Sequence, residues 1–211
     1  KTFNLSVDGV FGHLYLWQPI TYQFLHDDFF HILFNGIVLW SFGGVIEKRW
    51  NTRAFLGFFL GCGLGGAAAI LIWQIIFPGP KVTPAGWSTI ETLGASGGIM
   101  GVVAAYCIYH WNQRLRMLFI PFPIKAKHLL FVFIGLDVLF VAMGSHVSIA
   151  GHLGGMATGA LLITGWYKPR RLITEYRLRR ARRRLRLLKG GHPLDIDHDR
   201  KKSNGDSRYL H

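Results

Sequence analysis

The sequence is organised around Leu93-Gly94-Ala95-Ser96-Gly97-Gly98-Ile99-Met100-Gly101, where one serine lies among four glycines at the start of an apolar stretch. Glycines on both sides of a serine allow the backbone to turn sharply and leave the side chain uncovered. A helix beginning at this point would also offer free N–H groups and a positive dipole end, which favour a nucleophile whose reaction creates an oxyanion. Taken alone the pattern is weak, because serine and glycine are also common where membrane helices pack.

A second stretch, Ala150-Gly151-His152-Leu153-Gly154-Gly155, places a histidine in a similar setting. Small residues recur at every fourth position in both stretches: Gly97, Gly101 and Ala105 in one, and Gly151, Gly155 and Gly159 in the other. Such stripes let two helices approach closely. Close approach is what the short Ser96 side chain needs to reach His152 on another helix, so the sequence predicts a serine–histidine pair.

Composition assigns the chain to the membrane class. Of its 211 residues 50% are hydrophobic and only 17% are charged, which excludes disorder as the main state. The net charge is +13, but 15 of the 24 Lys and Arg residues fall in 168–211. An almost uncharged body therefore carries a basic tail, and the overall charge is no argument for nucleic-acid binding.

Five apolar stretches approach the roughly 20 residues that a helix needs to cross a bilayer. They cover about 29–46, 54–77, 93–109, 128–143 and 147–167. The sequence therefore predicts an all-α fold, a polytopic membrane helix bundle with its core at 29–167. Residues 1–28 are expected to form an outward-facing first loop. Cys62 and Cys107 lie inside apolar stretches and are interpreted as small buried residues.

Basic residues alternate between the connections. They gather in 47–53, in 110–127 and in the tail, whereas 78–92 has only Lys81 and 144–147 has none. The positive-inside rule then places the N-terminal segment, 78–92 and 144–147 outside, and the other connections and tail in the cytoplasm. An odd number of spans with an outer N-terminus leads us to expect a further span upstream of the first residue.

Polar side chains within predicted spans are costly and tend to mark function. The set is His31, Asn35, Ser96, Asp137 and His152. His31 and Asn35 share a helix face, and His26 lies just before them. These three residues allow either a metal site, which would lack a carboxylate or thiolate partner, or a polar pair that joins neighbouring helices.

Asp137 lies in the middle of the fourth stretch. We expect its carboxyl to be protonated and hydrogen-bonded to a neighbouring helix, with the tuning of gating as the other interpretation. A place as third member beside Ser96 and His152 is not expected, because the residue count puts Asp137 deeper in the membrane.

Several short motifs in order and spacing carry a family resemblance. They are Trp17-Gln18, Thr21-Tyr22-Gln23-Phe24-Leu25-His26, His31-Ile32-Leu33-Phe34-Asn35, Phe42-Gly43-Gly44-Val45-Ile46-Glu47, Gly94-Ala95-Ser96-Gly97 and His152-Leu153-Gly154-Gly155. Over roughly residues 15–166 the sequence resembles the rhomboid intramembrane serine proteases of the bacterial type. The resemblance implies a six-span core, of which this chain would show five spans.

By this resemblance Ser96 is the nucleophile and His152 the general base, a dyad without an acidic third member. The oxyanion hole would be formed by His31, Asn35 and the Ser96 backbone N–H. The same resemblance makes Gly94, Gly97, Met100 and Gly155 supporting residues of the site. It implies no cofactor and no metal, and it implies substrates that are transmembrane segments of other membrane proteins.

Two positions depart from the family pattern: Gln18 replaces an arginine in the first loop, and Met100 replaces an aromatic residue that stacks on the catalytic histidine. They leave open a catalytically inactive rhomboid-like protein that binds transmembrane helices. A small transporter is a further alternative, but it predicts a polar path through the bilayer. The basic segment 170–189 suits either anionic lipid headgroups or plain solvation.

Overall fold

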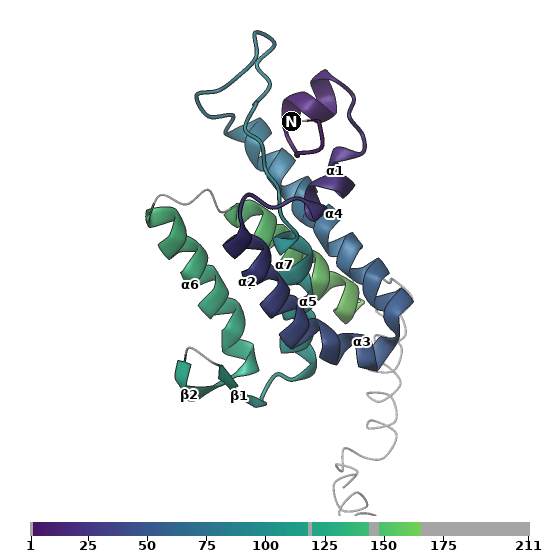
Figure 1. Cartoon of the computed structure of the whole chain (residues 1–211), viewed down its shortest axis with the longest axis vertical. Helices are drawn as coiled ribbons and strands as arrows, with labels where there is room; N and C mark the ends of the chain where they lie inside the picture. The colour runs from purple at the N-terminus through teal and green to yellow at the C-terminus, as the bar shows by residue number, and fades with distance from the viewer. Residues whose placement is uncertain (1, 118–119, 144–147, 166–211) are drawn as a thin grey trace, which may run out of the picture. The chain divides into compact units, whose positions relative to one another are not determined.

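The computed structural model describes residues 2–117, 120–143 and 148–165, which form a bundle of helices with one small β-hairpin (Figure 1). The helices and strands described below belong to one compact unit, Lys1–Thr164. The predicted basic tail at 168–211 and the turn at 144–147 lie outside the described residues.

The first predicted span is helical from Phe29 to Trp50. It consists of α2 (Phe29–Val38), a π-helical turn η3 (Leu39–Gly43) and α3 (Gly44–Trp50). The Asp28 side chain caps its start by accepting a hydrogen bond from the His31 backbone N–H at 2.9 Å. The helix continues past residue 46, the end of the predicted span, and the charged residues that follow lie in its last turn, where Arg49 stacks on the Tyr109 ring at 4.4 Å.

Helix α4 (Thr52–Ile76) follows after a single residue, Asn51, whose φ of 95° reverses the chain. The Asn51 side chain accepts a hydrogen bond from the Ala54 N–H at 3.0 Å and so caps the helix. Among the described residues, Phe29–Trp50 and Thr52–Ile76 are the two helices long and apolar enough to cross a membrane.

The remaining long helices are shorter than their predicted spans. They are α5 (Ser96–Tyr109), α6 (Leu129–Ala142) and α7 (Ile149–Thr164), of 14, 14 and 16 residues. At about 1.5 Å per residue they extend about 21–24 Å, less than the roughly 30 Å of a hydrocarbon core. The described residues therefore establish a mostly helical bundle, and the count of five spans stays a prediction.

The connection at 110–127 contains a β-hairpin, which corrects the all-α prediction. Strands β1 (Arg114–Met117) and β2 (Ile120–Lys125) are antiparallel. Leu115 pairs with Ile124, and both side chains pack against the apolar core of the bundle. The hairpin forms because this cross-strand pair can bury one face against the helices.

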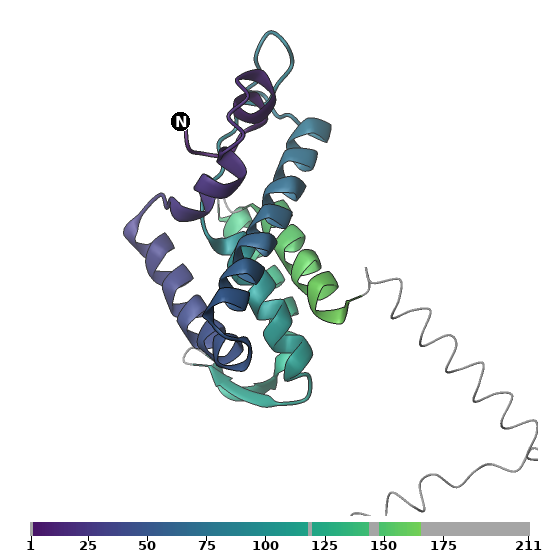
Figure 2. The ribbon, with the colours of Figure 1, turned by 90° about the vertical axis from the view of Figure 1, so that its right-hand side faces the viewer.

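Helix α5 lies at the centre of the bundle. Every residue from Gly97 to Cys107 is buried, and α4 and α7 pack along the helix. Cys62 and Cys107 are buried and free, as predicted. Figure 2 shows α4, α5 and α7 side by side in the view turned by 90°, and α4 and α7 also contact each other directly.

The outer surfaces of α2, α4 and α6 remain apolar. Large exposed hydrophobic side chains on the first span and on α4 and α6 include Phe29, Phe30, Phe34, Trp40, Leu56, Leu64, Ile72, Trp73, Phe131, Val138, Leu139 and Phe140. Patches of this extent are rare on the surface of soluble proteins, and they suit contact with lipid.

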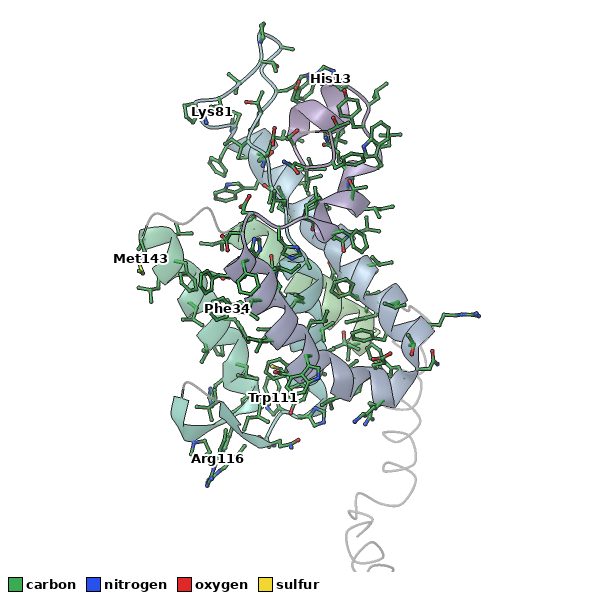
Figure 3. All side chains as sticks on the ribbon, in the orientation of Figure 1. His13, Phe34, Lys81, Trp111, Arg116 and Met143 are labelled. Atoms are coloured by element: carbon green, nitrogen blue, oxygen red, sulfur yellow. The ribbon has the colours of Figure 1, made fainter. Side chains whose placement is uncertain are left out.

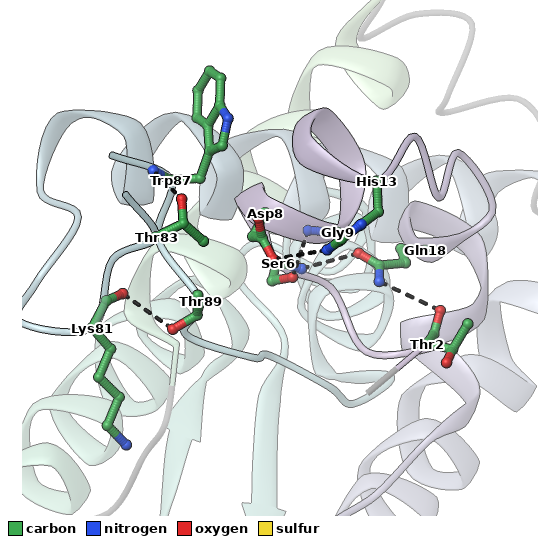
Figure 4. Close-up of polar contacts among 10 residues, drawn as sticks. All are labelled: Thr2, Ser6, Asp8, Gly9, His13, Gln18, Lys81, Thr83, Trp87 and Thr89. Carbon is green, nitrogen blue, oxygen red and sulfur yellow. Dashed lines mark hydrogen bonds and ion pairs between the residues drawn. The ribbon is translucent and has the colours of Figure 1, made fainter. Parts of the chain in front are cut away.

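The N-terminal segment folds into short helical turns, namely η1 (Asp8–Gly12), α1 (Gln18–Thr21) and η2 (Tyr22–Phe24). Gln18 is buried there, with its Oε1 accepting from the Ser6 N–H at 3.2 Å and its Nε2 donating to the Thr2 carbonyl at 3.4 Å (Figure 4). The glutamine thus anchors this segment at the position where the family pattern has arginine.

The connections separate towards two ends of the bundle. Figure 3 shows His13 and Lys81 at one end, Trp111 and Arg116 at the other, and Phe34 between them. The side of the membrane that each end faces stays a prediction.

Candidate active site

Ser96 is the first residue of α5, and the backbone before it is tightly held. Gly94 has a φ of +124°, which a residue with a side chain rarely adopts, and its N–H donates to the Tyr22 carbonyl at 2.9 Å. The Tyr22 hydroxyl in turn donates to the Gly63 carbonyl on α4 at 2.7 Å. Burial raises the pKa of Tyr22, which keeps the phenol protonated as a donor. These bonds fix the point at which α5 begins and therefore the Ser96 side chain.

Helices α5 and α7 cross immediately beside the candidate pair. A Cβ atom on Gly155 would collide with the carbonyl of Gly97, and one on Gly159 would lie 2.8 Å from the Cα of Gly101. A Cβ on Gly66 of α4 would also lie 2.9 Å from the Gly151 carbonyl oxygen. The predicted close approach of the two glycine stripes is confirmed, and α4 shares the crossing.

His152 forms a short contact that was not expected from the sequence. Its Nδ1 lies 2.7 Å from Oδ2 of Asp137 on α6, and both side chains are buried. The expected bond from Asp137 to a neighbouring helix is confirmed, but the argument that Asp137 lies too deep to meet His152 was wrong. Counting residues along two helices gives relative depth only if the helices start level and stand parallel.

Ser96 and His152 form no hydrogen bond with one another among the described residues. Contacts of this kind are often loose in the absence of substrate. Because Nδ1 of His152 faces Asp137, the ring nitrogen left for a serine is Nε2. The pairing of Ser96 with His152 stays a prediction, supported by the helix crossing beside them.

His31 lies over the turn that precedes Ser96. A Cβ on Gly94 would be 2.9 Å from Nε2 of His31 and 3.7 Å from the Ser96 Oγ. The His26 and His31 rings meet edge to face with their centroids 4.9 Å apart. Burial, and next the nearby His31, lower the pKa of His26. Within the described part of the chain no group of three or more His, Cys, Asp or Glu side chains could hold a metal.

Asn35 follows His31 by one turn of α2, and the nitrogen of its side-chain amide is a buried donor. The Nδ2 atom is buried and has no hydrogen-bond partner among the described residues. Buried amide donors are nearly always paired, since leaving one unpaired costs about 1–3 kcal/mol. An unpaired donor on the same helix as His31 is what an oxyanion site requires before substrate binds.

Met100, one turn after Ser96, is buried in the apolar core. Its role as a supporting residue of the site stays a prediction. Tyr22 and Asp137 were not predicted from the sequence as partners of the site. Tyr22 lies within one of the family motifs, and Asp137 stood out only as a charge within an apolar span, so their contacts required the three-dimensional structure.

The described residues therefore form a helical bundle with an apolar outer surface, in which His31 lies near Ser96 and His152 contacts Asp137. The Rhomboid domain family model matches residues 13–169, and the chain belongs to the rhomboid family. It is 30% identical over 167 residues to RHOMBOID-like protein 12, mitochondrial, of Arabidopsis thaliana, covering 76% of this chain and 49% of the relative. It is 29% identical over 155 residues to Rhomboid protease GlpG of Yersinia pestis strain Pestoides F, covering 71% and 48%. The chain spans about half the length of these curated relatives.

Proposed function

We propose that this chain is an intramembrane serine endopeptidase that hydrolyses peptide bonds in or near transmembrane segments of other membrane proteins. The observation that carries the proposal is the glycine-lined crossing of α5 and α7, which lies beside Ser96 on one helix and His152 on the other. Membership of the rhomboid family and similarity to a protein named as a rhomboid protease support it.

In the proposed reaction Ser96 attacks the carbonyl carbon of the peptide bond while Nε2 of His152 takes the serine proton. The C–N bond then breaks, the proton passes from His152 to the leaving amine, and an acyl-enzyme remains. Water then attacks this ester while His152 takes a proton from the water, and His152 returns that proton to the Ser96 oxygen as the acid product leaves. Partial exposure of Ser96 supports access of water to the site.

We assign three hydrogen-bond donors to stabilise the negative charge that develops on the carbonyl oxygen. These are the side chains of His31 and Asn35 and the backbone N–H of Ser96, which has no intrahelical acceptor because it begins α5. The buried, unpaired Asn35 Nδ2 supports this assignment. Removing one such donor typically lowers kcat by about 10²–10³.

The proposed topology follows the charge alternation. It has five spans in a cell membrane, with the active site towards the outer face and the C-terminal tail in the cytoplasm, where its arginines would contact anionic lipid. A peptide bond within an intact helix is shielded, so the proposed substrates carry helix-weakening residues near the outer face.

The test is cleavage of a single-span reporter protein in liposomes by the wild-type chain and by Ser96→Ala. The proposal expects cleavage by wild type and none by the variant, with equal thermal unfolding midpoints. Cleavage retained by Ser96→Ala would remove Ser96 as nucleophile. If folded wild type fails to cleave but captures the reporter helix, the result would favour the alternative of an inactive helix-binding protein.

A further inference from the structure

We propose that Asp137 is a positioning residue for the general base: it accepts a hydrogen bond from Nδ1–H of His152 and so presents Nε2 to Ser96. This inference rests on the proposed function. It adds an acidic third member to what the family resemblance describes as a serine–histidine dyad. It also replaces the expectation of a protonated carboxyl with a carboxylate that acts as acceptor.

The distance and the burial of His152 and Asp137 support a strong hydrogen bond between their side chains. The 2.7 Å separation of Nδ1 and Oδ2 is at the short end for a nitrogen–oxygen hydrogen bond, as expected when one partner is charged. The side chains of His152 and Asp137 are only 9% and 8% exposed, so water does not compete for either group.

The position of Asp137 on α6 strengthens the inference. The buried residues of this helix are Leu129, Phe133 and Asp137, spaced four apart along one face. An apolar third member would complete this stripe, and a carboxyl in its place is unfavourable unless a partner compensates. On α6 the next residues, Val138 and Leu139, are exposed and apolar, so the polar group is confined to the face that meets His152.

The chemistry that follows concerns the tautomer of His152. With its proton on Nδ1 and directed at Asp137, the imidazole carries a free electron pair on Nε2, which is the form that can accept the Ser96 proton. During attack the proton moves from Ser96 Oγ to Nε2, and the carboxylate stabilises the resulting imidazolium. The proton then leaves from Nε2 to the amine, and Asp137 itself neither gains nor loses one.

A purely structural role makes different predictions. A hydrogen bond that only joins α6 to α7 would affect unfolding, and an amide of the same shape would serve nearly as well. Asp137→Asn separates the two roles, because an amide can instead donate to Nδ1 and hold the ring in the tautomer that cannot act as base.

The kinetic experiment compares wild type, Asp137→Asn and Asp137→Glu in the liposome assay, with thermal unfolding midpoints as the control for folding. For Asp137→Asn we expect kcat to fall by about 10²–10⁴ with KM little changed, and Asp137→Glu to recover part of that loss. A kcat for folded Asp137→Asn within about threefold of wild type would overturn the positioning role and leave the proposed function intact. An inactive wild type would instead refute the proposed function.

A second measurement needs no cleavage. Nitrogen-15 NMR of the wild-type protein labelled at histidine reports which ring nitrogen of His152 carries the proton, with His152→Ala identifying the signal. The proposal expects a protonated Nδ1 and a bare Nε2 at neutral pH. A proton on Nε2 with a bare Nδ1 would overturn it, whatever the kinetics show.

Discussion

Gly155→Ala adds one methyl group at the point where α7 crosses α5. The new Cβ would meet the carbonyl oxygen of Gly97, with the carbonyl carbon of Gly97 at 2.7 Å and its Cα at 3.1 Å. All three atoms are backbone, so no side chain can rotate away to make room. The two helices must therefore move apart.

The size of the movement follows from these distances. An ordinary carbon–carbon contact is about 3.4–4 Å, so the carbonyl carbon at 2.7 Å requires a separation of at least about 0.7 Å. Ser96 lies next to Gly97, and His152 lies one turn before Gly155, so the movement acts directly on the candidate pair. A misplacement of about 1 Å can cost about 10² in rate, and overpacking costs about 1–3 kcal/mol.

The assay measures kcat for reporter cleavage in liposomes and the unfolding midpoint of each protein in the same detergent. Gly135→Ala on α6 is the matched control, because a Cβ added at Gly135 would have nothing within 4 Å. We expect Gly155→Ala to lose about 10² in kcat and the control to keep wild-type kcat. Folded Gly155→Ala with a kcat within about threefold of wild type would refute the idea that this crossing sets the serine–histidine geometry.

Three further perturbations test other parts of the structure. Asn35→Ala should lower kcat by about 10²–10³ without loss of folding, measured by reporter cleavage, and an unchanged kcat would remove Asn35 from the oxyanion hole. Asn51→Ala removes the cap on the Ala54 N–H at a residue with a φ of 95°, and should destabilise the protein by about 0.5–2 kcal/mol. Asn51→Gly should destabilise the protein less, because glycine adopts a positive φ readily, and equal unfolding midpoints for the two variants would contradict this. The pKa of His26 is lowered in the fold, so the unfolded chain binds the proton more tightly, and the free energy of unfolding should fall as pH decreases from about 6.5. Unfolding measured against pH should show a weaker dependence for His26→Gln.

The contact between α5 and α7 could be predicted from sequence because its cause is local and periodic. A small residue at every fourth position marks one helix face, and two such faces in one chain favour each other. The stripe through Gly97 and the stripe through Gly155 meet as expected. Helix bounds do not follow from this periodicity, because Gly94 and Asn51 set them through backbone torsions and hydrogen bonds to other segments.

The partner of His152 could not be predicted in the same way. Asp137 lies on a different helix, and the relative tilt of α6 and α7 decides whether the two side chains meet. The hairpin at Arg114–Lys125 is a further example. Its cross-strand pair, Leu115 and Ile124, is stabilised by packing against the helices, so the local sequence alone predicts only a connection between two helices.

The N-terminal segment has a consequence for biosynthesis. Leu5 pairs with Thr92 through two backbone hydrogen bonds of 2.8 Å, and Tyr22 holds both Gly63 and Gly94. A nascent chain cannot form these long-range contacts until residue 94 has left the ribosome, and His152 follows later still. The turn before Ser96 is thus completed only after two long helices have been made, and the proposed protease acquires its general base later than its nucleophile, so nascent forms that end before His152 cannot cleave neighbouring proteins during insertion.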